Sequence, residues 1–184
     1  MQRVRANRRT IITNVIFLSS LILMLLLDQI LKTVFKNLSE NTIWLQTPII
    51  EGFFSFKYTL NKGSAFSFLA DKSWGQIFFK ILTALALIAF FFFYIYVCKK
   101  NYKWLRWALI LIIAGTIGNF IDRLAYNGVV DFISFVFGSY HFPIFNLADV
   151  YLTIGVTMLI IHYLFLDKEA VFKRKAKKDA NSNN

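Results

Sequence analysis

Residues 81–98 read ILTALALIAFFFFYIYVC, an uninterrupted apolar run that lies between Lys80 and the pair Lys99-Lys100. A helix needs about 20 apolar residues to cross a hydrocarbon core about 30 Å thick. Lysine side chains at the two ends of such a helix extend their charges toward the interfaces. This stretch therefore predicts a transmembrane helix, and the rest of the chain has to be organised around a bilayer.

Three further apolar runs flank this one, at residues 11–27, 107–121 and 151–166. Extending each run to its interfacial residues predicts spans over 11–34, 76–98, 103–124 and 146–166. The first run is expected to be an uncleaved span and not a signal peptide, because no small-residue cleavage site follows Leu27. The sequence predicts an all-α integral membrane protein with four transmembrane helices, folded as a single domain over residues 1–168.

Composition and charge support this class. The chain is 57% hydrophobic and 17% charged, too few charges to cover a soluble globule. A net charge of +11 would suggest nucleic acid in a soluble protein, but most of the basic residues lie in three clusters beside the apolar runs. The clusters are Arg3, Arg5, Arg8 and Arg9; Lys99, Lys100, Lys103 and Arg106; and Lys168, Lys173, Arg174, Lys175, Lys177 and Lys178. The positive-inside rule then predicts that both termini are cytoplasmic, and no nucleic-acid partner is expected.

The segment between the first two spans has a different character. Residues 42–69 contain the β-favouring runs Thr42–Leu45 and Gly52–Leu60, followed by the turn Asn61-Lys62-Gly63. These runs predict a small extracytoplasmic sheet, a β-cradle, that rests on the membrane surface or covers a groove. The polar tail at residues 169–184 is expected to be disordered and cytoplasmic.

Ionisable and amide side chains gather at the predicted outer ends of the spans. Asp28 ends the first span, Asn119, Asp122 and Arg123 end the third, Asn146 and Asp149 open the fourth, and Asp131 lies in the loop between the last two. Carboxylates near hydrocarbon are costly and usually functional. Taken singly, each aspartate has an ordinary explanation as an interfacial, paired, loop or capping residue. Their convergence on one face of the membrane predicts a polar site there.

Residue chemistry narrows the reaction that such a site supports. The two histidines, His141 and His162, lie on opposite predicted sides, and no metal-binding spacing of His or Cys occurs, so neither a metal nor a cofactor is expected. The single Cys98 reads as a packing residue. Ser–Lys catalysis by Ser64 with Lys62 is conceivable, but neither residue lies on a rigid helix. A pair of carboxyl groups sharing one proton remains, with one as base and the other as acid.

Five sequence blocks, in order, resemble those of signal peptidase II: DQILK at 28–32, NKGSAFS at 61–67, GTIGNFIDR at 115–123, VDF at 130–132 and FNLAD at 145–149. The resemblance extends from about residue 15 to 166. It implies that Asp131 and Asp149 are a catalytic dyad, a choice that composition alone leaves open between Asp131 and Asp122. It also implies a supporting and substrate-binding polar shell, in which Arg123 neutralises Asp122. The shell comprises Asp28, Lys32, Asn61, Gly63, Asn119, Asp122, Arg123 and Asn146.

The same resemblance implies a biological setting. An aspartyl endopeptidase of the bacterial cytoplasmic membrane would remove the signal peptide from prolipoproteins, cutting before a cysteine that carries diacylglycerol. Its active site would face the extracytoplasmic side, beneath the β-cradle and a short interfacial helix. Its partners would be the prolipoprotein and membrane lipids, and the enzyme would be a monomer.

Two other classes stay open on the sequence alone. An ion-coupled transporter also places carboxylates among its spans, but usually near the bilayer midplane and with a repeated half. A membrane assembly factor would use aromatic residues such as Phe90–Phe93 as a partner surface, yet it would leave the aspartates unexplained.

Overall fold

The computed structural model describes residues 2–41, 48–63, 74–100 and 102–166. The elements in these residues are α1 (Gln2–Asn41), β1 (Phe54–Asn61), α2 (Gly75–Lys100), α3 (Lys103–Tyr126), β2 (Val129–Phe137), β3 (Tyr140–His141), α4 (Leu147–Ile161) and the π-helical turn η3 (His162–Leu166). Four helices in them are long and apolar enough to cross a membrane, over Ile11–Ser39, Gly75–Lys100, Lys103–Tyr126 and Leu147–Phe165. The predicted fold, four spanning helices with a small sheet, is confirmed.

The helices run further at the sheet end than predicted. α1 continues to Asn41 instead of residue 34, and α3 continues to Tyr126 instead of 124. Asn127 ends α3 by adopting a left-handed conformation, with φ of 52°, which asparagine tolerates better than most residues. Which side of the membrane the two termini face stays a prediction.

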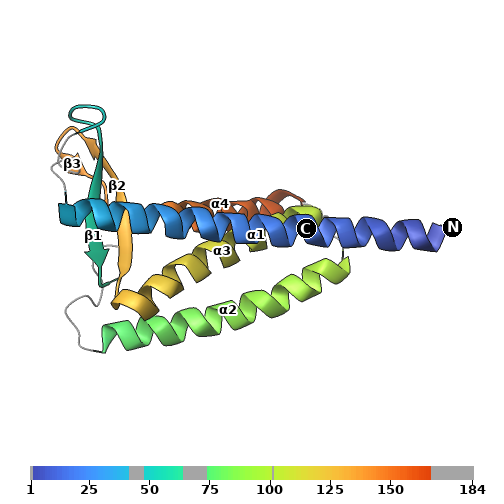
Figure 1. The fold of residues 1–184 in the computed structure, drawn as a ribbon. Coiled ribbons are helices and arrows are strands. Elements are labelled where there is room, and N and C mark those ends of the chain that lie inside the picture. The colour runs from blue at the N-terminus through green and yellow to red at the C-terminus, as the bar shows by residue number, and fades with distance from the viewer. Residues whose placement is uncertain (1, 42–47, 64–73, 101, 167–184) are drawn as a thin grey trace, which may run out of the picture.

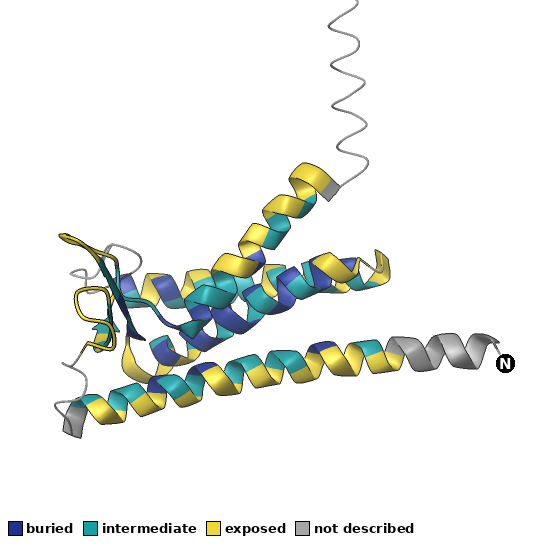
Figure 2. Ribbon diagram, turned by 90° about the horizontal axis from the view of Figure 1, so that it is seen from above, coloured by how far each residue is buried: buried dark blue, intermediate teal, exposed yellow. Residues whose placement is uncertain are grey.

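Helix α3 is the centre of the bundle. In the most apolar part of α3, 56% of the residues are buried, against 11%, 6% and 11% in α1, α2 and α4. α3 packs against all three other helices, whereas few of the apolar side chains of α1, α2 and α4 are buried and many are exposed (Figure 2). The exposed apolar surfaces suit a hydrocarbon solvent, and α3 is the natural support for a site inside the bundle.

The sheet stands at one end of the bundle, across from the N-terminus (Figure 1). Its strands are antiparallel in the order β1-β2-β3. The predicted strand at Gly52–Leu60 is confirmed as β1, but β1 pairs with β2, which follows α3. The sheet is therefore not confined to the segment between the first two helices, and the predicted strand Thr42–Leu45 lies outside the described residues. Asp131 lies within β2, opposite Thr59, and not in a loop as expected.

Aromatic contacts fix the sheet against the first helix. The ring of Phe35 on α1 stacks on Phe132 of β2 at 4.4 Å between centroids and contacts Phe56 of β1 at 4.5 Å. Such ring pairs stabilise by about 0.5–1.5 kcal/mol beyond the area they bury. They fix β2, and with it Asp131, beside the C-terminal part of α1. The short interfacial helix implied by the resemblance is not among the helices of the described residues, and the predicted tail at 169–184 lies outside them.

Candidate active site

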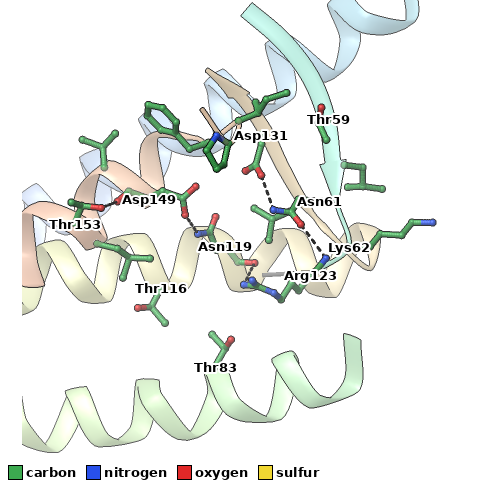
Figure 3. Close-up of a pocket in the computed structure, with 18 of the residues that line it drawn as sticks. Thr59, Asn61, Lys62, Thr83, Thr116, Asn119, Arg123, Asp131, Asp149 and Thr153 are labelled. Atoms are coloured by element: carbon green, nitrogen blue, oxygen red, sulfur yellow. Dashed lines mark hydrogen bonds between the residues drawn. The ribbon is translucent and has the colours of Figure 1, made fainter. Parts of the chain in front are cut away.

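A pocket of about 1120 Å³ opens between the sheet and the helices that it covers. Its walls come from β1, α2, α3, β2, the segment 142–145 and α4 (Figure 3). Of the ten residues predicted for the site, six line this pocket: Asn61, Gly63, Asn119, Arg123, Asp131 and Asp149. The other four, Asp28, Lys32, Asp122 and Asn146, are buried behind it, each no more than 2% exposed. The structure thus brings all ten predicted residues to one end of the bundle.

Asp131 reaches the pocket from β2 and is only 3% exposed. Its carboxylate accepts a hydrogen bond from the amide nitrogen of Asn61 at 3.0 Å and another from that of Asn146 at 2.7 Å. Burial, and after it the charge of Asp149, raises the pKa of Asp131 from 3.8 to about 7, although the two amides and Lys32 act in the opposite direction. At neutral pH, Asp131 is therefore poised between its protonated and ionised forms.

Asp149 reaches the pocket from the first turn of α4. Its Oδ1 accepts from the amide nitrogen of Asn119 at 2.8 Å, and its Oδ2 accepts from the backbone N–H of Asn146 at 3.1 Å. The Asn146 side chain in turn accepts from the backbone N–H of Asp149 at 3.0 Å, which completes a capping box at the start of α4. Asn146 therefore connects the two carboxylates, because it caps the helix of one and donates to the other.

A charged cluster lies behind these two aspartates. The ammonium of Lys32 forms ion pairs with Asp28 at 2.9 Å and Asp122 at 3.0 Å, and it donates to the amide oxygen of Asn119 at 3.0 Å. Asp28 and Asp122 are not among the residues lining the pocket. The four aspartates thus form two pairs: Asp131 and Asp149 line the cavity, and Asp28 and Asp122 lie behind it and share the ammonium of Lys32.

Arg123 does not have the position that the resemblance suggested. It was expected to neutralise Asp122, but the cation that forms an ion pair with Asp122 is Lys32. Neighbouring residues on a helix point in different directions, so Asp122 is directed toward α1 and Arg123 toward the pocket. The guanidinium donates to the backbone oxygen of Asn119 at 3.4 Å, and its buried Nε has no partner among the described residues. The guanidinium also lies over the ring of Phe79, 5.6 Å from its centre, and it lines the pocket.

Gln29 also belongs to the buried cluster, although it was not among the predicted site residues. Its amide nitrogen lies 3.2 Å from an oxygen of Asp28, of Asp122 and of the Gly118 backbone. The sequence feature that could have indicated Gln29 is its place directly after Asp28, at the same end of the span. Ser64, considered for Ser–Lys catalysis, lies outside the described residues. Within the described part of the chain, no three His, Cys, Asp or Glu side chains are arranged to hold a metal ion.

This arrangement suits acid–base hydrolysis. Two carboxyl groups border one pocket, and burial raises the pKa of one of them, Asp131, to about 7. In such a pair the ionised carboxylate accepts a proton from water while the protonated one donates to the carbonyl under attack.

Comparisons with known proteins show which family the chain is similar to. A family model described as signal peptidase (SPase) II matches residues 20–165. A lipoprotein signal peptidase of Clostridium tetani is 43% identical over 151 residues, 81% of this chain and 90% of its own length. One from Bacillus pumilus is 41% identical over 147 residues, 79% of this chain and 90% of its length.

A solved structure agrees at the level of the fold. The chain is similar to a bacterial membrane enzyme determined by the in meso method at 1.9 Å resolution, with a TM-score of 0.66 and 33% identity. The match covers 81% of this chain and 92% of the solved one. With the four helices, the ordered sequence blocks and the family model in agreement, the chain belongs to the signal peptidase II family.

Proposed function

We propose that this protein is an aspartyl endopeptidase that removes the signal peptide from diacylglyceryl-modified prolipoproteins, cutting on the N-terminal side of the lipidated cysteine. The observation that carries the proposal is that Asp131 on β2 and Asp149 on α4 border the same pocket and are each held by two hydrogen bonds. Asp131 and Asp149 are the catalytic dyad in this proposal, and no metal or cofactor takes part.

The raised pKa of Asp131 favours it as the acid of the pair and leaves Asp149 as the base. Asp149 takes a proton from a water molecule, whose oxygen attacks the carbonyl carbon of the scissile bond. Asp131 donates its proton to the carbonyl oxygen, which gives a neutral tetrahedral diol. Asp149 then protonates the cysteine nitrogen, one diol hydroxyl returns its proton to Asp131, and the carbon–nitrogen bond breaks. Both carboxyl groups end in their starting states.

The surrounding residues orient the dyad and the substrate. Asn61, Asn119 and Asn146 donate to the two carboxylates and fix their planes. The backbone N–H of Gly63 donates to the oxygen of the Asn61 side chain at 3.0 Å, so that the amide nitrogen of Asn61 is directed at Asp131. Arg123, whose Nε has no partner within the described residues, is assigned to a carbonyl of the substrate.

The position of the site suits a substrate that is part signal helix and part lipid. Asp122 lies in the last turns of α3 and Asp149 in the first turn of α4, both at the sheet end of the bundle. A transporter would be expected to place them near the midplane. We place the protein in the bacterial cytoplasmic membrane as a multi-pass monomer, with both termini cytoplasmic and the active site at the extracytoplasmic face. Residues 1–168 form a single protease domain, and no nucleic acid is bound.

Cleavage of a diacylglyceryl-modified prolipoprotein by the purified protein in detergent tests this function. Asp131→Asn and Asp149→Asn each keep the size of the side chain and remove its charge, so both variants should be inactive while the parent cuts before the lipidated cysteine. Thermal unfolding of each variant checks that it is folded. Full activity of a folded Asp131→Asn would refute the dyad, and a folded parent that never cleaves the substrate would refute the function.

A further inference from the structure

Lys32 has an unusual number of partners for a lysine in a membrane-spanning helix. It is 2% exposed, and its ammonium has three acceptors within 3.0 Å: Asp28, Asp122 and Asn119. An ammonium has three N–H donors, so its hydrogen-bonding capacity is fully used. These three partners come from two helices, and Lys32 therefore joins α1 to α3 at the level of the pocket.

The two carboxylates that bind Lys32 each hold one backbone N–H group. Oδ1 of Asp28 accepts from the N–H of Ala148 at 2.9 Å, and Oδ2 of Asp122 accepts from the N–H of Val130 at 3.0 Å. Ala148 immediately precedes Asp149, and Val130 immediately precedes Asp131. The backbone next to each aspartate of the proposed dyad is thus connected to the ammonium of Lys32. Asp28 makes this connection next to Asp149, and Asp122 makes it next to Asp131.

The third partner acts on a side chain. Because the oxygen of the Asn119 amide binds Lys32, its nitrogen is directed away from Lys32 and donates to Asp149 at 2.8 Å. Replacing the ammonium by an apolar group would leave this oxygen with the amide of Asn146, at 3.1 Å, as its donor, so the amide that donates to Asp149 would be held less firmly.

We propose that Lys32 is a positioning residue that fixes Asp131 and Asp149 relative to each other, by binding the two carboxylates and the amide that hold them. This inference rests on the proposed function for the role of the two aspartates. A packing role alone would be filled as well by apolar residues, because replacing a buried ion cluster by a hydrophobic one is often neutral or stabilising. Fixing two catalytic groups requires directional bonds, which the ammonium supplies.

Charge gives this proposal a second, independent readout. The positive charge of Lys32 holds the pKa of Asp131 below the value that burial and Asp149 would otherwise give. The other groups facing Asp131 are the amides Asn61 and Asn146, while Arg123 and Lys62 line the same pocket. Losing Lys32 therefore raises the pKa of Asp131, and a purely mechanical loss of packing does not.

The experiment compares Lys32→Met, Lys32→Arg and the matched control Lys36→Met. Lys36 lies one turn further along α1, where its ammonium is 3.9 Å from the centre of the Tyr126 ring, outside the site. Lys32→Met should lower kcat/KM about 100-fold, the order of loss that misplacing catalytic groups by about 1 Å produces. Its remaining activity should persist to a pH about one unit higher than that of the parent. Lys32→Arg should keep the parental pH limit, and Lys36→Met should match the parent in both rate and pH limit.

Two outcomes overturn the proposal. Lys32→Met cleaving at the parental rate would show that the dyad needs no such connection, and a slow Lys32→Met with the parental pH limit would reduce Lys32 to a packing role. If Lys32→Met does not fold, it is replaced by a double variant that carries both Lys32→Met and Asp122→Asn. This variant loses one positive and one negative charge, so the net charge of the cluster is unchanged. That variant should cleave at least about tenfold more slowly than Asp122→Asn alone; equal rates would overturn the proposal.

A measurement without turnover separates this inference from the proposed function. Thermal unfolding across pH 4–9 is compared for the parent and Lys32→Met, each with and without Asp131→Asn. The pH dependence that Asp131→Asn removes belongs to Asp131, and in Lys32→Met it should extend to higher pH. An unchanged range would contradict the role of Lys32 even if the parent cleaves no prolipoprotein.

Discussion

The amide nitrogen of Asn119 lies 2.8 Å from Oδ1 of Asp149, and the oxygen of the same amide accepts from Lys32 and Asn146. Neither end of this amide can be exchanged without loss, because one side must donate and the other must accept. Asn119 is only 6% exposed, so losing one of these hydrogen bonds would leave a buried polar group without its partner, which costs about 1–3 kcal/mol. The orientation of Asp149 therefore requires an amide side chain at position 119.

Asn119→Asp should consequently lower cleavage about 100-fold or more, since a carboxylate would replace the donor and repel Asp149. The measurement is kcat/KM on the lipidated prolipoprotein. Asn127→Asp is the control with the same chemical change: Asn127 caps α3 at an exposed position, and its oxygen already accepts from Lys80 at 2.8 Å. The control should cleave like the parent. Equal activity of Asn119→Asp and Asn127→Asp would contradict the role of the amide.

The raised pKa of Asp131 predicts how stability depends on pH. In the unfolded chain Asp131 titrates near 3.8, and in the folded protein near 7, so the folded state holds more protons between these values. The free energy of unfolding must then fall as pH rises from about 4 to about 7 and level off above that range. Asp131→Asn removes this component, so its thermal unfolding temperature should change less over this window.

Every other titrating group is common to the parent and Asp131→Asn, so the difference between the two curves isolates Asp131. In a chain of this size each kcal/mol corresponds to about 2–4 °C of unfolding temperature. Asp131→Asn should therefore be the more stable protein above pH 7. Parallel curves for the two proteins would show that Asp131 is not held protonated.

The hydrogen bond from Asn61 should also influence the pKa of Asp131. Its amide donates to Oδ2 of Asp131 at 3.0 Å and so favours the ionised form. Asn61→Ala should raise the pKa of Asp131 further, lower the rate about tenfold through loss of a charge-assisted bond, and shift the upper pH limit of activity upward. Rates measured from pH 5 to pH 9 report both effects. Ser55→Ala, on the same strand and away from this pocket, should change neither, and an unshifted limit in Asn61→Ala would exclude the contact as a determinant.

The four helices were predictable because crossing a membrane is a property of composition and length, readable within each segment. The position of Asp131 was not. Residues 129–137 read VVDFISFVF, a β-favouring stretch that is too short to suggest its own partner, and the strand forms by pairing with β1 more than 60 residues earlier. Such long-range pairing leaves no local signal.

The partner of Asp122 shows the same limit at the level of one side chain. The resemblance suggested Arg123, yet residues adjacent on a helix do not face each other, and Lys32 binds Asp122 from another helix. The separation of the aspartates into a pocket pair and a buried pair likewise depends on tertiary contacts. The resemblance of the sequence blocks therefore indicated which residues to consider for the site, and the fold was needed to assign their partners.

Gly118 and Gly155 give a paired test of whether damage to helix packing can be told from damage to the site. A Cβ added at Gly118 would lie 2.5 Å from Oδ2 of Asp28, the oxygen that binds Lys32. A Cβ added at Gly155 would lie 2.7 Å from the backbone oxygen of Ala108, between α3 and α4.

Both substitutions to alanine should lower the unfolding temperature, because overpacking typically costs about 1–3 kcal/mol. Only Gly118→Ala should also lower kcat/KM per folded molecule, by about tenfold or more, since it displaces the carboxylate that holds the backbone before Asp149. Activity is normalised to the folded fraction for this comparison. A folded Gly118→Ala with parental kcat/KM would show that the dyad tolerates displacement of Asp28, and an equal loss in Gly155→Ala would mean that bundle packing alone limits the rate.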